Sequence, residues 1–258
     1  PVSGWGASVY AGSASFTIAV SDTYVGVSNS ATISANTWYH YAIVRSGNSF
    51  TLYINGVGGT AVTNTSSINA QAAGLNIGRS TYTLNLREFK GYISNLRIVK
   101  GTAVYTSNFT PSTIPLTAIT NTSLLTCQSN RFRDASTNNF TITRNGNTTQ
   151  GTFSPFSLAA GEWSNYFDGT DDYVTVPDNS EFDFGAGDFT IEYWEYRTSS
   201  GIQSPILSRN TITYTPYVIG WNDGATPTVL MIYMSSNGSS FDIASDVSMG
   251  VITTNVWT

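Results

Sequence analysis

Charged residues are scarce in this sequence. Only 10% of its 258 residues are Asp, Glu, Lys or Arg, against roughly 25% in an average soluble domain. Lys90 and Lys100 are the only lysines, and the formal net charge is -5. Recognition of a nucleic-acid backbone depends on clustered Lys and Arg side chains. We therefore expect no nucleic-acid partner.

Cysteine and histidine occur once each. Cys127 alone cannot form an internal disulfide, and a zinc site built on several thiolates is excluded. It lies in the apolar run "SLLTCQS", which favours a buried structural thiol over a nucleophile. His40 lies in a strand-like segment, where we expect a packing or hydrogen-bonding role.

Long hydrophobic runs and helical patterns are also missing. No stretch of 18 apolar residues occurs, so we expect no membrane span, and no signal peptide is recognisable. Because the chain begins at Pro1, this does not bear on secretion. No segment of 12 or more residues shows a convincing helical period.

Strand patterns dominate instead. Short segments rich in β-branched and aromatic residues are separated by turns containing Gly, Asn and Asp. This pattern predicts an all-β protein, an antiparallel β-sandwich or jelly roll. The expected strands lie at 38–45, 49–56, 91–99, 138–146, 172–177 and 188–197. The segment 110–120, with two prolines, is predicted to be a linker.

A weak internal repeat indicates duplication. Trp5 and Trp221 stand 216 residues apart in similar Gly-containing phrases, and Trp38 and Trp257 stand 219 residues apart. We therefore expect residues 1–118 to be the C-terminal part of one sandwich and 119–258 the N-terminal part of a second. The chain would then be an excerpt of a tandem array. Two alternatives stay open: the parts close into one permuted sandwich, or each needs further chain.

Several phrases resemble one family. Residues 166–197, "YFDGTDDYVTVPDNSEFDFGAGDFTIEYWEYR", resemble the opening of laminin-G-like domains of the concanavalin A-like lectin/glucanase superfamily. Residues 36–56 and 89–111 resemble its closing half, and 123–146 resemble its first strands. The wording is most similar to repeats in bacteriophage virion proteins, above all tail and fibre components. The closing half comes first here, which independently favours an excerpt of an array.

The resemblance implies two curved antiparallel sheets that bind glycans or proteins through rim loops, often with structural calcium and usually without catalysis. Calcium takes six to eight oxygen ligands, and "FDGTDD" supplies Asp168, Asp171 and Asp172. In similar domains an acidic residue near the phrase "GYI-x-x-L-R-I" can approach this loop; here that phrase departs from the pattern and carries Asn95, a neutral oxygen donor, as the fourth candidate ligand. The alternative is an ordinary Asp-Gly turn without a metal.

Aromatic residues in polar loops are the candidates for ligand binding. A sugar ring stacks on an aromatic face while nearby amides and carboxylates bond its hydroxyl groups. Residues of these types in or near Gly-, Ser- and Asn-rich loops are Trp5, Tyr24, Tyr82, Trp221, Asn222 and Asp223. The alternative is that the tryptophans cap the core.

The two closely spaced glutamates do not predict an enzyme. Glycosidases place two carboxylates about 5–9.5 Å apart facing one substrate. Glu192 and Glu195 are three positions apart on an expected strand, so their side chains point to opposite faces. We expect one to be solvated and the other to be satisfied within the sheet.

We therefore interpret the chain as a non-enzymatic adhesion module on a virion or extracellular surface, binding host or environmental glycans or another surface polymer. Neighbouring repeats or virion proteins are expected as further partners, in a homo-oligomeric assembly. Two alternatives remain: a purely structural fibre or capsid decoration or spacer, and a glycoside hydrolase, which the missing acid pattern disfavours.

Overall fold

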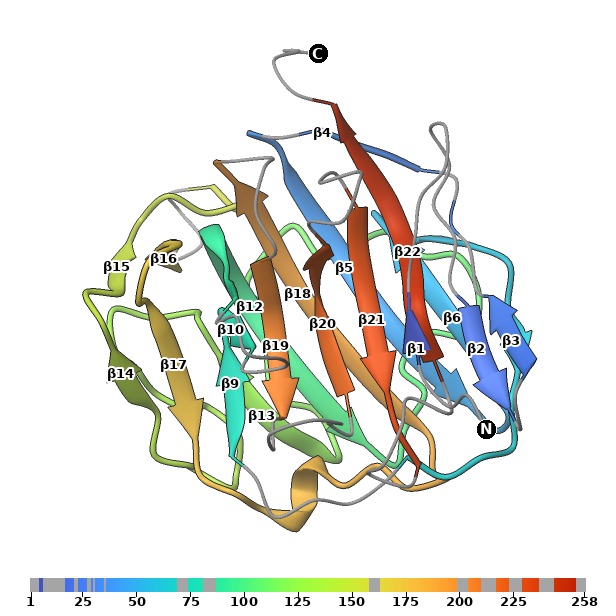
Figure 1. The fold of residues 1–258 in the computed structure, drawn as a ribbon. Helices are drawn as coiled ribbons and strands as arrows, with labels where there is room; N and C mark the ends of the chain where they lie inside the picture. The colour runs from blue at the N-terminus through green and yellow to red at the C-terminus, as the bar shows by residue number, and fades with distance from the viewer. Residues whose placement is uncertain are drawn as a thin grey trace.

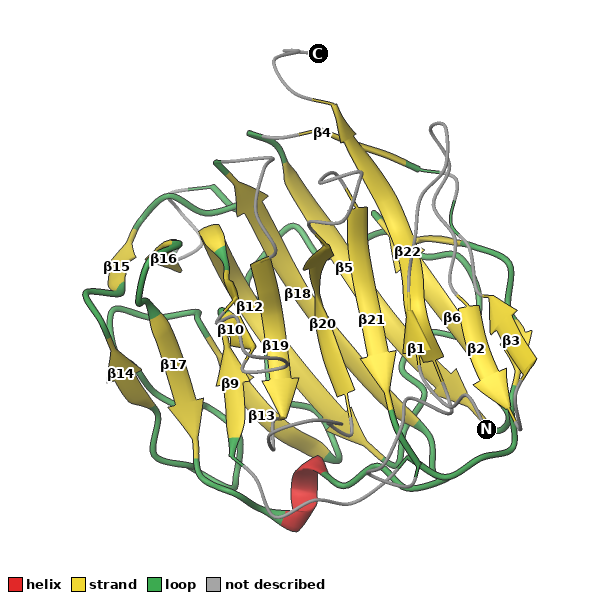
Figure 2. Cartoon of the chain, viewed as in Figure 1, coloured by secondary structure: helices red, strands yellow, loops and turns green. Residues whose placement is uncertain are grey.

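The structure is a computed structural model made almost entirely of β-strands in two layers (Figure 1 and Figure 2). The described ranges contain one short 3-10 turn, η2 (Ser180–Phe182), and no α-helix. The predicted fold class, an antiparallel concanavalin A-like β-sandwich, is confirmed. The structure describes residues 5–6, 17–20, 23–26, 29, 31–34, 36–68, 74–80, 87–157, 163–198, 204–209, 217–222, 229–236 and 244–253.

One layer is an eleven-stranded sheet, whose central strands β19, β20 and β21 lie at the front of Figure 1. Its strands in spatial order are β14 (Thr143–Asn145), β17 (Tyr173–Val176), β9 (Leu75–Ile77), β19 (Ser204–Arg209), β20 (Tyr217–Asn222), β21 (Val229–Met234), β22 (Ala244–Thr253), β1 (Trp5–Gly6), β2 (Thr17–Val20) and β3 (Thr23–Gly26), with β4 (Thr32–Ser34) also beside β22. Among the described pairs only β22 with β1 and β22 with β4 are parallel.

The second layer is a nine-stranded antiparallel sheet that lies behind the first in Figure 1. Its strands in spatial order are β15 (Thr149–Gly151), β16 (Ser164–Asp168), β12 (Lys90–Lys100), β18 (Phe189–Arg197), β5 (Trp38–Ser46), β6 (Ser49–Ile54) and β7 (Val57–Gly58), with β13 (Thr122–Thr126) beside β12 and β8 (Val62–Thr63) beside β6. A separate hairpin pairs β10 (Arg79–Ser80) with β11 (Arg87–Glu88).

Strands from the two predicted segments, 1–118 and 119–258, contribute to both sheets and are partly interleaved. In the nine-stranded sheet β12 pairs with β16 on one side and β18 on the other, and β18 also pairs with β5. In the other sheet β9 lies between β17 and β19. The structure thus has the arrangement in which both segments close into one sandwich. The duplication and the array stay predictions.

The core lies between the sheets and follows from strand periodicity. Along β5, Tyr39, Tyr41 and Ile43 belong to the core, where they meet side chains of the other sheet such as Leu75 and Ile219. Successive residues on a strand face opposite sides, so His40, Ala42 and Val44 point to the outer face. They are nevertheless buried, which requires a cover on that face.

The cover is the segment 101–119, which we call the strap. Tyr105 and Phe109 stack with ring centroids 3.6 Å apart and pack against Ala42, Val44 and Tyr53. The strap includes most of the predicted linker 110–120. That part connects the segments but is also anchored by hydrogen bonds, since its Leu116 N–H donates to the side chain of Asn95.

Candidate functional site

The predicted ligand-binding residues lie at the limit of what the structure describes. Trp5 lies on β1, Tyr24 on β3, and Trp221 and Asn222 on β20. Their side chains lie outside the described residues, as do Tyr82 and Asp223 altogether. The rim-loop site therefore stays a prediction.

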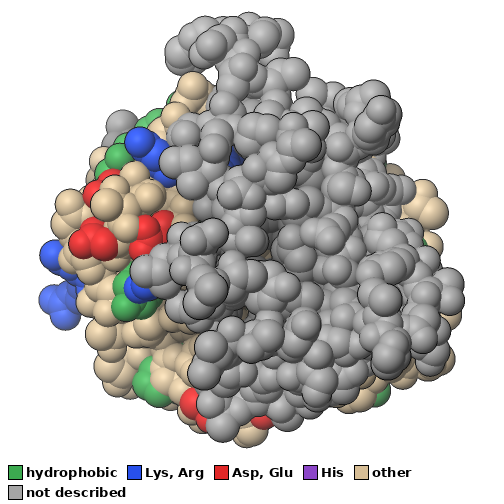
Figure 3. Space-filling view, in the orientation of Figure 1, with side chains coloured by type: hydrophobic (Ala, Val, Ile, Leu, Met, Phe, Trp, Pro, Cys, Tyr) green, Lys and Arg blue, Asp and Glu red, His purple; other side chains and the backbone are tan. Residues whose placement is uncertain are grey.

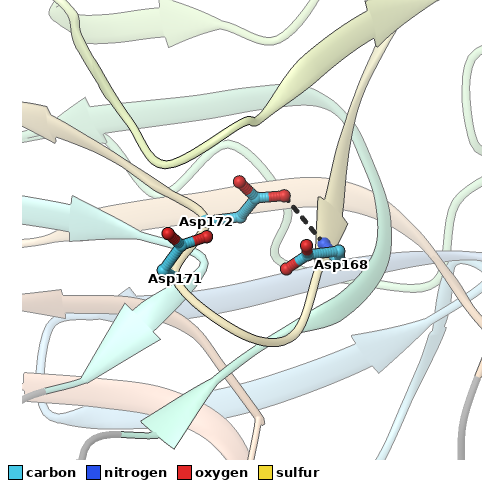
Figure 4. Close-up of side chains that lie close together, drawn as sticks. All are labelled: Asp168, Asp171 and Asp172. Atoms are coloured by element: carbon cyan, nitrogen blue, oxygen red, sulfur yellow. Dashed lines mark hydrogen bonds between the residues drawn. The ribbon is translucent and has the colours of Figure 1, made fainter.

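The predicted metal site is a tight turn between β16 and β17. Asp168 ends β16, and Gly169 follows with φ +82°, a left-handed conformation that suits glycine. The backbone N–H of Asp168 donates to Asp172 Oδ2 at 2.9 Å, and the N–H of Thr170 donates to Asp168 Oδ1 at 2.8 Å. These bonds fix two of the carboxylates next to each other (Figure 4).

The three aspartates converge as the sequence predicts. One ligating oxygen from each of Asp168, Asp171 and Asp172 lies within 4.8 Å of the others. Asp172 is buried, Asp168 is half-buried and Asp171 is exposed. Acidic side chains gather on the corresponding side of the molecule, with Lys and Arg side chains on the same side (Figure 3).

Electrostatics at this turn disfavour the ionised forms of Asp172 and the neighbouring Glu88. Burial is the main effect that raises the pKa of the Asp172 carboxyl, and the charge of Asp168 adds to it, although the hydrogen bond from the Asp168 N–H opposes the shift. Burial also raises the pKa of Glu88, against the attraction of Arg79, and the three aspartates increase the shift. A divalent cation would relieve this repulsion.

Glu88 is the acidic neighbour that the sequence interpretation missed. It stands two residues before Lys90, which pairs directly with Asp168, and its charge interacts with the aspartate turn. The signal was present in "REFKGYI", because strand pairing of "GYI" with the "FDG" strand carries the preceding residues toward the same turn.

The structure does not place Asn95 at the turn. Asn95 lies five residues beyond Lys90 on β12, a separation of roughly 16 Å along a strand. Its Oδ1 accepts the Leu116 N–H at 2.8 Å, and its Nδ2 donates to Ser94 Oγ at 2.9 Å. With φ +51° it forms the bulge between the two pairing registers of β12. Its geometry is that of a residue that holds the strap.

The two glutamates of β18 point to opposite faces, as predicted. Glu192 pairs with Ala42 and faces outward. Glu195, three residues farther along β18, pairs with the core residue Tyr39 and faces inward. Both are buried, so the expectation that one is solvated was wrong. The reason is that the strap covers the outer face at Glu192, where Tyr105 contacts it, while Glu195 lies on the core side.

Glu192 is held by a buried polar network. Its Oε1 accepts from Arg97 Nε at 2.6 Å, and its Oε2 accepts from the Tyr105 hydroxyl at 2.7 Å and lies 3.2 Å from His40 Nε2. Burial acts to raise the pKa of Glu192, but the hydrogen bond with His40 and the charge of Arg97 lower it overall. His40 has the hydrogen-bonding role that the sequence predicts.

Glu195 lies on the core side of the same strand. Burial lowers the pKa of the neighbouring Arg197 to about 10, while the charges of Glu195, Tyr41 and Tyr193 act to raise it. These opposite charges share one buried environment between the sheets. Neither glutamate faces the other, so β18 does not provide a pair of carboxylates that share one substrate.

The comparisons with known proteins bear on these features. Residues 3–107 match the family model Laminin_G_3, described as the concanavalin A-like lectin/glucanases superfamily. No match was found among curated proteins or solved structures. The matched residues include the segment that resembles the closing half of such domains. The match supports a lectin-like or adhesion-type module at the level of the superfamily.

The same superfamily includes glucanases, as its description states, so the match does not exclude catalysis. The finer resemblance to bacteriophage virion proteins finds no support in the comparisons and stays a prediction. Within the described ranges the structure has no helix with the length and apolarity to cross a membrane.

Proposed function

We propose that this chain is a non-catalytic adhesion module that binds glycans or another surface polymer through its rim loops, on a virion or other extracellular surface. The observation that carries the proposal is the closed two-layer sandwich together with the superfamily match of residues 3–107. Sandwiches of this kind place loops at the sheet rims, where ligand contacts can vary without disturbing the core.

The placement of the strand glutamates supports a non-catalytic role. Glu192 is committed to Arg97, His40 and Tyr105, and Glu195 faces the core. A general acid needs access to a substrate oxygen, and neither side chain has it. The proposal also includes assembly with further copies or virion proteins, in which case shallow sites gain from avidity.

Calcium at the aspartate turn is part of the proposal. Asp168, Asp171 and Asp172 supply hard carboxylate oxygens within 4.8 Å of one another, which is the donor type that calcium prefers. The raised pKa of Asp172, caused mainly by burial and increased by the charge of Asp168, supports a site where a cation would favour the ionised form. When bound, the ion would stiffen the turn between β16 and β17.

A glycan array tests the adhesive role. We expect the 258-residue protein to bind a subset of immobilised glycans, and Trp221→Ala to abolish that binding while far-ultraviolet circular dichroism stays unchanged. Ile114→Ala, at a side chain 61% exposed on the strap, serves as the control that keeps binding. Absence of binding to every glycan and host polysaccharide would contradict the proposal.

Two further outcomes would favour the alternatives. Release of reducing sugar from a polysaccharide, abolished by mutation of one carboxylate, would show a hydrolase. Electron microscopy of an ordered assembly with the rim loops covered by neighbouring copies would favour a structural decoration or spacer.

A further inference from the structure

A row of four aromatic side chains crosses the outer face of the nine-stranded sheet. Tyr166 on β16 pairs with Tyr92 on β12, which pairs with Tyr196 on β18, which pairs with Trp38 on β5. We call these four residues the ladder. They come from four adjacent strands that lie side by side in Figure 1. Three steps between strands span about 14 Å.

The rings of the ladder contact one another and carry a fifth ring. Centroids are 4.9 Å apart for Tyr166 and Tyr92, 5.9 Å for Tyr92 and Tyr196, and 5.6 Å for Tyr196 and Trp38. Phe153 stands edge-on against both Tyr92 and Tyr196 at 4.7 Å. Neighbouring ladder rings are inclined by 45° to 75°, so the surface is ridged and offers ring faces and edges in succession.

This aromatic surface is partly exposed to solvent, and Phe153 packs against three of the ladder rings. All four ladder residues are partly exposed, and Phe153 is 44% exposed. Farther along the same strands, the strap buries the outward-facing residues Ala42 and Val44. Five clustered aromatic rings that remain partly exposed are unusual on a protein surface and mark a contact site.

The border of the ladder provides hydrogen-bonding groups. Lys90 and Asp168 pair with each other two residues along their strands from Tyr92 and Tyr166, at the next position on the same face. Thr198 and Asn36 continue this border, because the Thr198 N–H donates to Lys90 O and the Asn36 N–H donates to Arg197 O. Both are exposed. On the edge strand β15, exposed Thr149 pairs with Tyr166.

These features select one type of partner. An aromatic surface bordered by hydroxyl, amide and single charged groups suits a ligand with apolar C–H faces and many hydroxyl groups. Lys90 lies beside Asp168, and the adjoining aspartate turn adds negative charge, so this border would not attract a polyanion. We infer that the ladder and Phe153 form a binding surface for a neutral polysaccharide chain, which lies across strands β16, β12, β18 and β5.

This surface shares its ligand class with the proposed function but lies on a different part of the molecule from the predicted rim-loop residues. Phe153 is its most exposed ring and Tyr196 its centre. Phe153→Ala removes a side chain that is only partly packed, so the fold should tolerate it. Tyr196→Phe keeps the ring and removes the hydroxyl, which separates stacking from hydrogen bonding.

The test measures binding of the 258-residue protein to cellulose, chitin, xylan, starch and β-1,3-glucan by pull-down, and to soluble oligomers of the bound polymer by calorimetry. We expect Phe153→Ala to weaken binding about tenfold, corresponding to about 1.4 kcal/mol, and Tyr196→Phe to weaken it less. Val57→Ala, at an exposed apolar side chain of the same sheet, is the matched control and should bind like the unchanged protein.

Hydroxyl-radical footprinting should show protection of Phe153 and Tyr92 by the bound polymer. Unchanged binding of Phe153→Ala without such protection would overturn the inference. Binding of heparin alone, or self-association that Phe153→Ala abolishes, would assign the surface to a polyanion or to a second copy and would also overturn it. Binding lost only in Trp221→Ala would leave the rim-loop proposal intact and reject the ladder. Binding lost only in Phe153→Ala would do the reverse.

Discussion

At the scale of the residue, the most consequential side chain is Glu192, whose charge is buried beneath the strap. A buried carboxylate is tolerated only when partners replace its hydration. Arg97 and Tyr105 do so here, and Arg97 also donates to the carbonyl of Thr117 at 2.8 Å. One carboxylate thus ties β18 to β12 and to the strap.

Removing this carboxylate should be costly. We expect Glu192→Ala to lower the free energy of unfolding by about 3–5 kcal/mol, because Arg97 would remain buried without its counter-ion. Urea titration measures the effect. Asp171→Ala, at an exposed acidic residue, should change stability by about 0.5 kcal/mol or less in the absence of calcium. Equal effects from the two substitutions would contradict the role of the network.

The aspartate turn should respond to pH in the opposite direction from Glu192. The pKa of Asp172 is raised by burial, so the folded state binds a proton more tightly than the unfolded state. Its contribution to stability is therefore present below the ordinary Asp pKa, about 4, and is lost as pH rises through the higher folded pKa. For Glu192, with a lowered pKa, stability is lost as pH falls through the folded pKa.

Calcium should restore the stability that the aspartate turn loses as pH rises. We expect added calcium to raise the melting temperature at pH 7 and to have less effect at acidic pH, where protonation of Asp172, whose pKa is raised, competes with the ion. Asp172→Asn should remove the calcium effect and flatten the pH dependence of stability. Differential scanning calorimetry with calcium and with a chelator gives the comparison, and magnesium serves as the control. An unchanged melting temperature with calcium at pH 7 would refute the metal site.

At the scale of the element, local pattern predicted the long strands well. The expected segments 38–45, 91–99 and 188–197 correspond to β5 (Trp38–Ser46), β12 (Lys90–Lys100) and β18 (Phe189–Arg197). Each has alternating or continuous β-branched and aromatic residues, which suffices to define a strand. Cys127 follows β13 and is buried, and burial raises its pKa to about 12, in agreement with a structural thiol.

The expected strand at 138–146 was mostly wrong, and the reason is a side chain. Only Thr143–Asn145 forms β14. Before it, the Phe140 N–H donates to Asp134 Oδ2 at 3.0 Å, and Asp134 Oδ1 accepts from Leu125 and Ser136. The buried Asp134 thus replaces strand pairing with a compact loop. A pattern of alternating residues does not reveal that a buried side chain will accept the backbone hydrogen bonds in place of a neighbouring strand.

The ladder escaped prediction for a related reason. Tyr92, Tyr196 and Trp38 belong to segments that are far apart in the sequence, and their alignment depends on the register of β12, β18 and β5. Register between distant strands is set by packing of the whole core. The aspartates could be predicted because they lie in one turn, whereas the approach of Glu88 required the pairing of β12 with β16.

Gly91 is the position where this pairing leaves no room for a side chain. Its φ is +148°, and a Cβ there would lie 2.2 Å from the carbonyl oxygen of Tyr196 on β18. We expect Gly91→Ala to cost about 2 kcal/mol or more of stability, measured by urea titration. Gly151→Ala on β15 is the control, because nothing lies within 4 Å of its added Cβ. Equal stability of the two variants would mean that β12 and β18 do not pair as described.

At the scale of the whole molecule, the sandwich depends on strands from both predicted segments. The strands β5, β6 and β12 carry one half of the nine-stranded sheet, and β16 and β18 insert among them. Their core residues form a single cluster. Each segment lacks several of its pairing partners without the other, and this agrees with closing-half phrases that precede opening-half phrases in the sequence.

Cutting the strap tests this dependence. A site for a specific protease inserted after Thr113, next to exposed Ile114, should allow complete cleavage while the two pieces stay together. A denaturing gel should show two fragments, size-exclusion chromatography should show one species of the original size, and thermal unfolding should show one transition. Cleavage removes the covalent connection between the segments but leaves the hydrogen-bonded pairing of β12 with β16 and β18 intact. Fragments that separate under native conditions, each with its own melting transition, would instead mean that the segments 1–118 and 119–258 fold as independent units, and the shared sandwich would be wrong.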